Sequence, residues 1–118
     1  MRSRLELVRE LVRNPRPETA AIKELNQYGW DCPAPLVVLG ASDVLHILEL
    51  FCSGSIAAQD VEDWANRLEI REDIGFETKS QTVVDEVMFW LANPDINYPI
   101  DLNLVQRIKR VIDQNQLE

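Results

Sequence analysis

The sequence predicts an all-α fold, a single-domain bundle of about six helices, and three observations support this prediction. Apolar residues recur at three- and four-residue intervals in most segments, which is the periodicity of amphipathic helices. Proline and glycine fall mostly between these segments, and the alternating pattern typical of strands is missing. With 118 residues, of which 46% are hydrophobic, the chain is sized for one core. We therefore expect one helical domain over residues 1–118.

The first two helices are predicted over residues 3–14 and 17–27. The apolar stripe of the first consists of Leu5, Val8, Leu11 and Val12. Pro15 and Pro17 separate the two helices, because proline disfavours the helical conformation in the residue before it. Pro17 also suits the first position of the second helix, where its missing N–H costs little.

The stretch from residue 30 to residue 41 is ambiguous. Residues 30–35 contain two prolines and are predicted to form a loop. Residues 36–39 are apolar and partly β-branched, and alone they would pass for a short buried strand. Because no second strand is evident elsewhere in the chain, we interpret them as extended chain or a helical lead-in that packs on the core.

A central helix is predicted over residues 42–53. Ser42 is its expected N-cap, and Gly54 is the expected residue beyond its C-terminus. Its polar positions form one narrow stripe of Asp43, His46 and Glu49. A helix that is apolar nearly all round is buried, so we expect the bundle to form around this one. Cys52 lies in its apolar run and is expected to be a buried small hydrophobe.

Three more helices are predicted over residues 57–69, 80–92 and 101–114. The core stripe of the first consists of Val61, Trp64, Ala65 and Leu68. Residues 70–79 are expected to form a loop between the first two of these helices. Asp101 is a good N-cap for the last helix.

Charge is distributed unevenly along the chain, whose net charge is −8. Residues 24–101 carry fifteen acidic and three basic side chains, whereas residues 1–23 and 102–118 are both net positive. An electrostatic field of one sign around a small domain indicates which partners it attracts, and it does not indicate which fold it adopts. It repels nucleic acid and anionic lipid, and it attracts basic proteins.

The sequence carries no signature of catalysis, and we expect neither an enzyme, nor a metal site, nor a cofactor. The stripe of Asp43, His46 and Glu49 could hold a divalent metal, but His46 is the only histidine and no HExxH motif is present. Nucleotide-binding glycine motifs are also missing. Two cysteines, Cys32 and Cys52, lack CxxC spacing, so a redox role is not predicted.

Nucleic-acid binding is also disfavoured, although residues 42–69 superficially resemble a helix-turn-helix. The recognition helix would carry four acids against the single base Arg67, and phosphate contact requires Lys and Arg. No apolar run approaches the roughly 20 residues of a membrane-spanning helix. The N-terminus lacks the apolar region of a signal peptide, so we expect a cytoplasmic protein with no membrane partner.

An acidic cluster between residues 60 and 77 is the candidate interaction surface. It is either a solvated face that aids solubility or a patch complementary to a basic protein, whose approach it would accelerate. Loop aromatics provide candidate anchors, and Phe76 lies within the cluster. The predicted partner-binding residues are Asp60, Glu62, Asp63, Glu69, Glu72, Asp73, Phe76 and Glu77.

A resemblance points in the same direction. The run GSIAAQDVEDWA at residues 54–65, followed by LEIRED at residues 68–73, resembles small helical bacterial proteins, and some of these are similar to immunity proteins of polymorphic or contact-dependent toxin systems. The helix stop LANP at residues 91–94 belongs to the same pattern. The resemblance implies a cytosolic protein that neutralises a cognate toxin, often a nuclease with a basic active site. It transfers no catalytic residue to this chain.

The sequence thus predicts a non-enzymatic protein-binding inhibitor that occludes a basic partner, such as a nuclease toxin domain, with its acidic surface. The expected state is a monomer or a weak dimer. The alternative is a structural or adaptor helical module that self-associates and has no toxin partner. In that case the exposed acids would serve only solubility.

Overall fold

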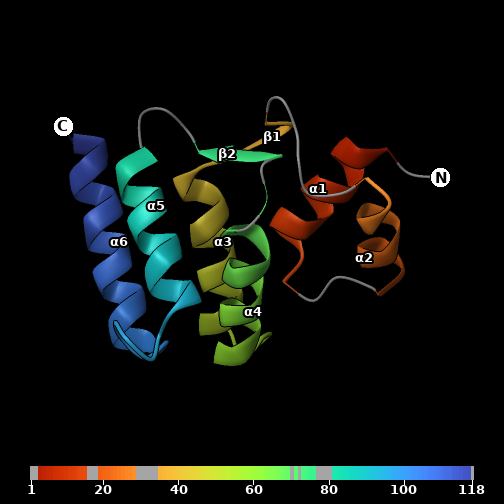
Figure 1. The fold of residues 1–118 in the computed structure, drawn as a ribbon. Coiled ribbons are helices and arrows are strands. Elements are labelled where there is room, and N and C mark those ends of the chain that lie inside the picture. Colours follow the sequence, from red (N-terminus) through yellow and green to blue (C-terminus); the bar gives the residue numbers. More distant parts are fainter. Residues whose placement is uncertain are drawn as a thin grey trace.

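The computed structural model describes residues 3–15, 19–28, 35–69, 71, 73–76 and 81–117. These residues form mainly helices, which confirms the predicted all-α bundle of about six helices (Figure 1). In chain order the elements are α1 (Arg4–Arg13), α2 (Thr19–Asn26), β1 (Val37–Leu39), α3 (Ala41–Cys52), α4 (Ala58–Glu69), β2 (Ile74–Phe76), α5 (Gln81–Ala92) and α6 (Leu102–Leu117).

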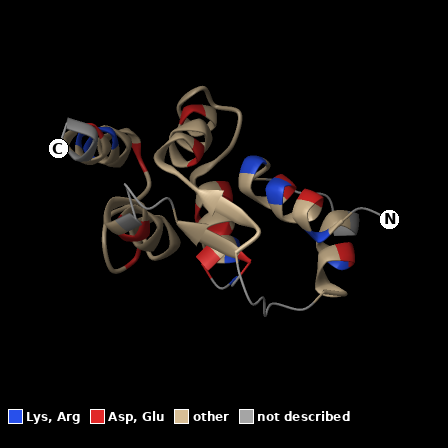
Figure 2. Ribbon diagram, turned by 90° about the horizontal axis from the view of Figure 1, so that it is seen from above, with Lys and Arg blue, Asp and Glu red and all other residues tan. Residues whose placement is uncertain are grey.

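The last four helices form an up-and-down bundle. Helix α3 contacts α4 and α6, and α5 contacts the same two helices, so the four lie at the corners of a square (Figure 2). Helix α1 packs against α3 and α4 on one side of this bundle, and α2 packs against α1. In the described part of the chain, no helix has the length and hydropathy needed to cross a bilayer.

The helix ends follow local signals in the sequence. Ser3 caps α1 by accepting a hydrogen bond from the Glu6 N–H, and Asp101 caps α6 by accepting one from the Leu104 N–H. Gly54 has φ of 83° and directly follows the C-cap of α3. The Gly54 N–H donates to the carbonyl of Phe51 and the Ser55 N–H to that of Leu50, which is a Schellman motif.

The ends of α3 also correct two expectations. Ser42 is not the N-cap, because the helix begins one residue earlier, after Gly40. The side chain of Asp43 reaches back and accepts a hydrogen bond from the Gly40 N–H at 2.9 Å. Cys52 is exposed rather than buried, although it is one turn after the buried Leu48, because it is the last residue of α3.

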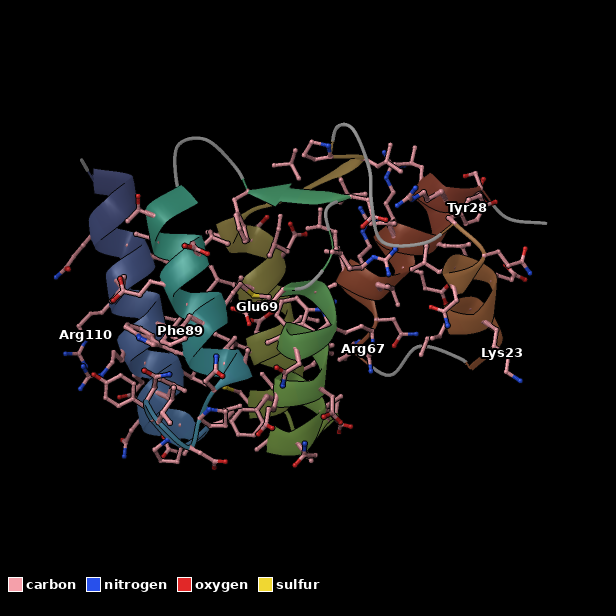
Figure 3. The ribbon with its side chains drawn as sticks, viewed as in Figure 1. Lys23, Tyr28, Arg67, Glu69, Phe89 and Arg110 are labelled. Carbon is pink, nitrogen blue, oxygen red and sulfur yellow. The ribbon has the colours of Figure 1, made fainter. Side chains whose placement is uncertain are left out.

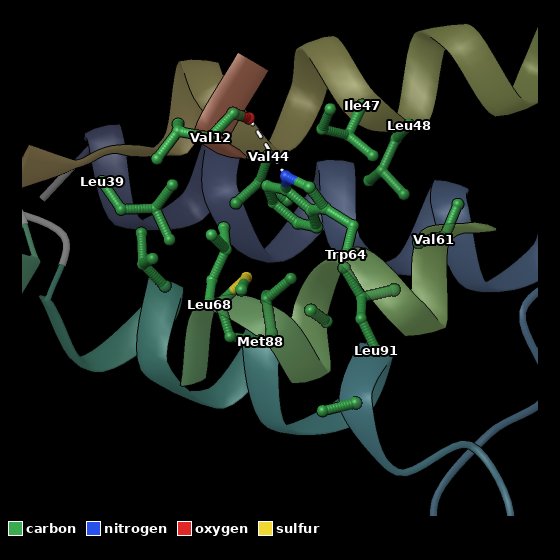
Figure 4. Packing of buried hydrophobic residues seen from close by; sticks show 14 of the residues in the cluster. Val12, Leu39, Val44, Ile47, Leu48, Val61, Trp64, Leu68, Met88 and Leu91 are labelled. Carbon is green, nitrogen blue, oxygen red and sulfur yellow. Dashed lines mark hydrogen bonds between the residues drawn. The ribbon is translucent and has the colours of Figure 1, made fainter. Parts of the chain in front are cut away.

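Trp64 of α4 lies at the centre of the hydrophobic core and is fully buried. Figure 4 shows its indole ring among side chains of α3, α4 and α5. The Nε1–H group donates a 3.0 Å hydrogen bond to the carbonyl oxygen of Val12, near the C-terminus of α1. The last carbonyls of a helix lack partners within that helix. The indole therefore satisfies such a carbonyl and joins α1 to the bundle.

The expectation for residues 36–39 and 70–79 was wrong in one respect, because both segments contain a strand. Strands β1 and β2 pair in parallel, with Val37 opposite Ile74 and Leu39 opposite Phe76. Parallel strands need a long crossover connection, which here is the helix pair α3 and α4. Three residues are too few to show the apolar–polar alternation of a strand, so the sequence did not indicate this pairing.

Gly75 lets the chain before β1 lie close to β2. A Cβ atom at this position would be 3.0 Å from both Cβ and Cγ of Pro35. The peptide carbonyl of Asp73, just before β2, accepts hydrogen bonds from the N–H groups of Leu36 and Val37. The small sheet is thereby fixed at one end of the bundle, next to α1 and α5 (Figure 1).

Candidate functional site

The predicted binding residues of α4 do not lie together, because they fall on different sides of its buried stripe. Its buried stripe is Val61, Trp64, Ala65 and Leu68. Glu62 and Glu69 are two turns apart and therefore share the edge that faces α5. Asp63 is exposed farther out, where it accepts a hydrogen bond from the side chain of Gln59. Two of the predicted residues, Glu62 and Glu69, thus lie on one edge of α4, whereas Asp63 lies on the outer side, one turn before Arg67.

Glu69 lies close to an acid of the neighbouring helix. Burial raises the pKa of Glu69 above its usual value, and the negative charge of Asp85 on α5 raises this pKa further. Figure 3 shows Glu69 at the end of α4 that lies beside α5. The fold therefore holds two like charges together across a helix pair, and this arrangement costs stability rather than adding to it.

Helix α5 adds three exposed side chains that the sequence analysis did not single out. Asp85 and Glu86 each lie about one turn before Phe89, so all three share one face of the helix. Phe89 is 44% exposed, although it is large and apolar. The buried stripe of α5 contains residues 84, 87, 88 and 91, and the helical spacing of these apolar residues in the sequence implies that residues 85, 86 and 89 face outward.

Together these side chains form a candidate interaction surface, which we name the α4–α5 face. Within the described residues, no Lys or Arg side chain forms an ion pair with the four carboxylates nearest the helix pair, which are Glu62, Glu69, Asp85 and Glu86. No described Lys or Arg side chain therefore compensates the negative charge of this surface. The α4–α5 face consists of Glu62, Glu69, Asp85, Glu86 and Phe89.

The other edge of α4 has a different character. Asp60 is partly buried, and its carboxylate accepts a 2.8 Å hydrogen bond from the Ala57 N–H at the start of the helix. Arg67 lies on the side toward α1 (Figure 3). Burial lowers the pKa of Arg67, and the nearby Asp63 carboxylate partly opposes this change. Asp60 therefore acts as a cap and lies apart from the α4–α5 face.

Asp73 is a correction to the predicted surface, because its side chain is 0% exposed. It accepts hydrogen bonds from Arg71 at 2.9 and 2.8 Å and from Nε of Arg4 at 3.0 Å. Burial alone would raise the pKa of Asp73, but the two guanidinium groups outweigh burial and hold it below 3.8. Asp73 thus joins α1 to the segment before β2, and its burial keeps it from contacting a partner.

The remaining predicted residues do not add to the α4–α5 face. Phe76 belongs to β2 and is half-buried, with its side chain packed against the core, so it is not a free anchor. Glu72 and Glu77 lie outside the described residues, as does Cys32. Tyr98 is a loop aromatic, but it is not a free anchor, because it packs edge-to-face on Trp90 at 5.5 Å between ring centroids and lies 4.5 Å from the guanidinium of Arg107.

The polar stripe of α3 lines a separate hollow between α3 and α6. His46 and Glu49 face Lys109 and Asp113 across it. Asp43 is not available there, because its carboxylate is bonded to the Gly40 N–H at the start of the helix. Across the described ranges, no group of three or more His, Cys, Asp or Glu side chains is placed to hold a metal ion.

No protein-family model, curated protein or solved structure matches this chain. A functional assignment therefore depends on the chain's own geometry. The geometry offers an exposed acidic face with one large apolar side chain in it, at the side of the bundle formed by α4 and α5.

Proposed function

We propose that this protein is a non-enzymatic inhibitor that binds a basic protein through the α4–α5 face. The partner's Lys and Arg side chains would pair with Glu62, Glu69, Asp85 and Glu86. A nuclease-like toxin that uses such cations to hold phosphate would then be occluded, as the resemblance to immunity proteins implies. The proposed location is the cytosol.

The uncompensated charge of the α4–α5 face is the observation that carries this proposal. Helices α3, α4 and α5 carry eight acidic residues and the single base Arg67, whereas basic residues are grouped on α1 and α6 (Figure 2). Glu69 and Asp85 stay close although they repel each other. A partner that supplies cations would relieve this repulsion. The free energy that the repulsion costs the folded chain would then be recovered in the complex and would favour binding.

Phe89 is the proposed anchor within the acidic rim. Charge mainly sets the association rate and selectivity of an interface, whereas a few buried aromatic or arginine side chains contribute most of its affinity. Phe89 is exposed and flanked by Asp85 and Glu86 on the same helix face. Its burial by a partner would remove apolar surface from water, which favours binding.

The test combines genetics with association kinetics. The protein encoded by the adjacent reading frame is co-expressed with this chain, and cell growth and the association rate are measured. The wild-type chain is expected to restore growth and to associate faster at low salt than at high salt. The variant Glu62→Lys/Asp85→Lys/Glu86→Lys is expected to associate about 10- to 100-fold more slowly at low salt.

A matched control separates the α4–α5 face from net charge. The variant Glu6→Lys/Glu49→Lys/Asp95→Lys changes net charge by the same amount at three exposed positions elsewhere. It is expected to retain most of the wild-type association rate. Equal rates for the two variants would contradict the assignment of the face. A concentration-dependent dimer in light scattering, with no binding of the neighbouring protein, would favour the self-associating module instead.

A further inference from the structure

Among the described residues, no strand pairs with the outer edge of β1. In the described part of the chain the sheet contains only β1 and β2, and α1 lies beside β1. Val37 donates its N–H to the carbonyl of Asp73 on the β2 side. In a parallel pair, alternate residues of a strand face the partner strand. The N–H and C=O groups of Val38 therefore point away from β2, and no described residue bonds to them.

The same strand exposes apolar side chains on its outer face. Val37 and Leu39 turn toward the core, whereas Val38 is 59% exposed and Leu36 is 40% exposed. An exposed hydrophobic edge strand pairs readily with another chain. Natural proteins usually protect such edges with a charge or a proline, and neither occurs within β1.

A hollow of about 240 Å³ lies along this edge. Its walls are Val38 and its neighbours in β1, together with Arg9 and Arg13 of α1. The two arginines are one turn apart and exposed, and neither forms an ion pair with a described residue. Asp43 also lines the hollow, but its carboxylate is bonded to the Gly40 N–H. The net field at the edge therefore favours an anion.

We propose that the β1 edge binds an extended acidic peptide segment of a partner protein by strand addition. Val38 would exchange an N–H and a C=O hydrogen bond with the segment, as in other strand-addition interfaces. An acidic side chain of the segment would pair with Arg9 and Arg13, and an apolar one would cover Val38. This site is distinct from the α4–α5 face and has the opposite charge, so neither proposal depends on the other.

The experiment uses a blocked synthetic peptide of alternating Glu and Val residues, titrated into the isotopically labelled full chain. Backbone amide signals of residues 36–39 and of α1 are expected to shift, and the Val38 amide is expected to gain protection from hydrogen exchange. A peptide with Lys in place of Glu is expected to bind on the order of tenfold more weakly or not at all.

Two variants separate the hydrogen bond from the charge. Val38→Pro removes the edge N–H, which the β1–β2 pairing does not use, and is expected to weaken binding on the order of tenfold. Val38→Thr keeps the N–H and is expected to bind like the wild type. Arg9→Glu/Arg13→Glu is expected to abolish the preference for the acidic peptide.

Three outcomes would overturn the proposal. The first is that the acidic peptide leaves the amides of residues 36–39 unshifted while the spectrum remains that of the folded chain. The second is equal binding of the Glu and Lys peptides. The third is a shift of the same amides with protein concentration alone, which would mean that the edge pairs with a second copy of this chain.

Discussion

At the scale of single residues, Trp64 is the side chain whose replacement should have the clearest effect. Trp64→Phe removes the donor to the Val12 carbonyl and leaves a void in the core. We expect a loss of about 2–4 kcal/mol in the free energy of unfolding, measured by urea denaturation. Trp90→Phe is the control, because Trp90 is only partly buried and should cost about 1 kcal/mol. Equal costs would contradict the central role of Trp64.

Asp73 predicts a pH dependence of stability. Its folded-state pKa lies below 3.8, so its contribution is complete above that value and is lost as pH falls through the folded value. Asp73→Asn removes the buried negative charge that pairs with Arg4 and Arg71 and should cost about 3–5 kcal/mol at neutral pH. Denaturation curves from about pH 6 to about pH 2.5 should show this difference shrinking toward acid. A difference that stays constant with pH would argue against the ion pairs.

The repulsion between Glu69 of α4 and Asp85 of α5 lowers the stability of the fold, and we expect it to favour the binding of a basic partner. The folded-state pKa of Glu69 is raised, so ionisation of this group opposes folding as pH rises through that value. Glu69→Gln should therefore leave stability at neutral pH unchanged or slightly higher, while it weakens association with a basic partner. Thermal melts and association rates of the same variant test both parts. A destabilised variant with unchanged binding would contradict the like-charge interpretation.

At the scale of elements, the sheet depends on the close approach of Pro35 to Gly75. Gly75→Ala places a methyl group 3.0 Å from the proline ring and should cost about 1–3 kcal/mol in the free energy of unfolding. In a Pro35→Gly background the same change should cost less, which a double-mutant cycle measures. Gly54→Ala is a useful contrast, because nothing lies near its Cβ and its cost of about 1 kcal/mol comes from positive φ alone. Additive costs of the Pro35 and Gly75 changes would contradict the contact.

For the whole molecule, the uneven charge predicts that salt increases stability. The chain carries a net charge of −8, and the acids of α3, α4 and α5 repel one another. Raising NaCl from about 0.02 M to about 0.5 M should increase the free energy of unfolding, because screening weakens this repulsion. The Glu62→Lys/Asp85→Lys/Glu86→Lys variant should respond less to salt. A wild-type protein that loses stability with salt would show that its attractive ion pairs outweigh the repulsion.

The sequence alone determined the features that local interactions control. The helix positions, the cap at Asp101 and the Schellman turn at Gly54 depend on residues within about five positions of each other, so their patterns are visible in one dimension. The inward stripe of α4 followed from the same periodicity. The concentration of acids in the middle of the chain was likewise a property of composition.

Only the tertiary structure decided which distant segments meet. It paired β1 with β2 across two helices, buried Asp73 between Arg4 and Arg71, and placed Glu69 beside Asp85. Apart from the pair of Arg71 and Asp73, each of these contacts joins residues many positions apart, where the free energy of burial and pairing outweighs local preference. For that reason the acids predicted as one surface separated into a buried ion pair, a helix cap and an exposed face.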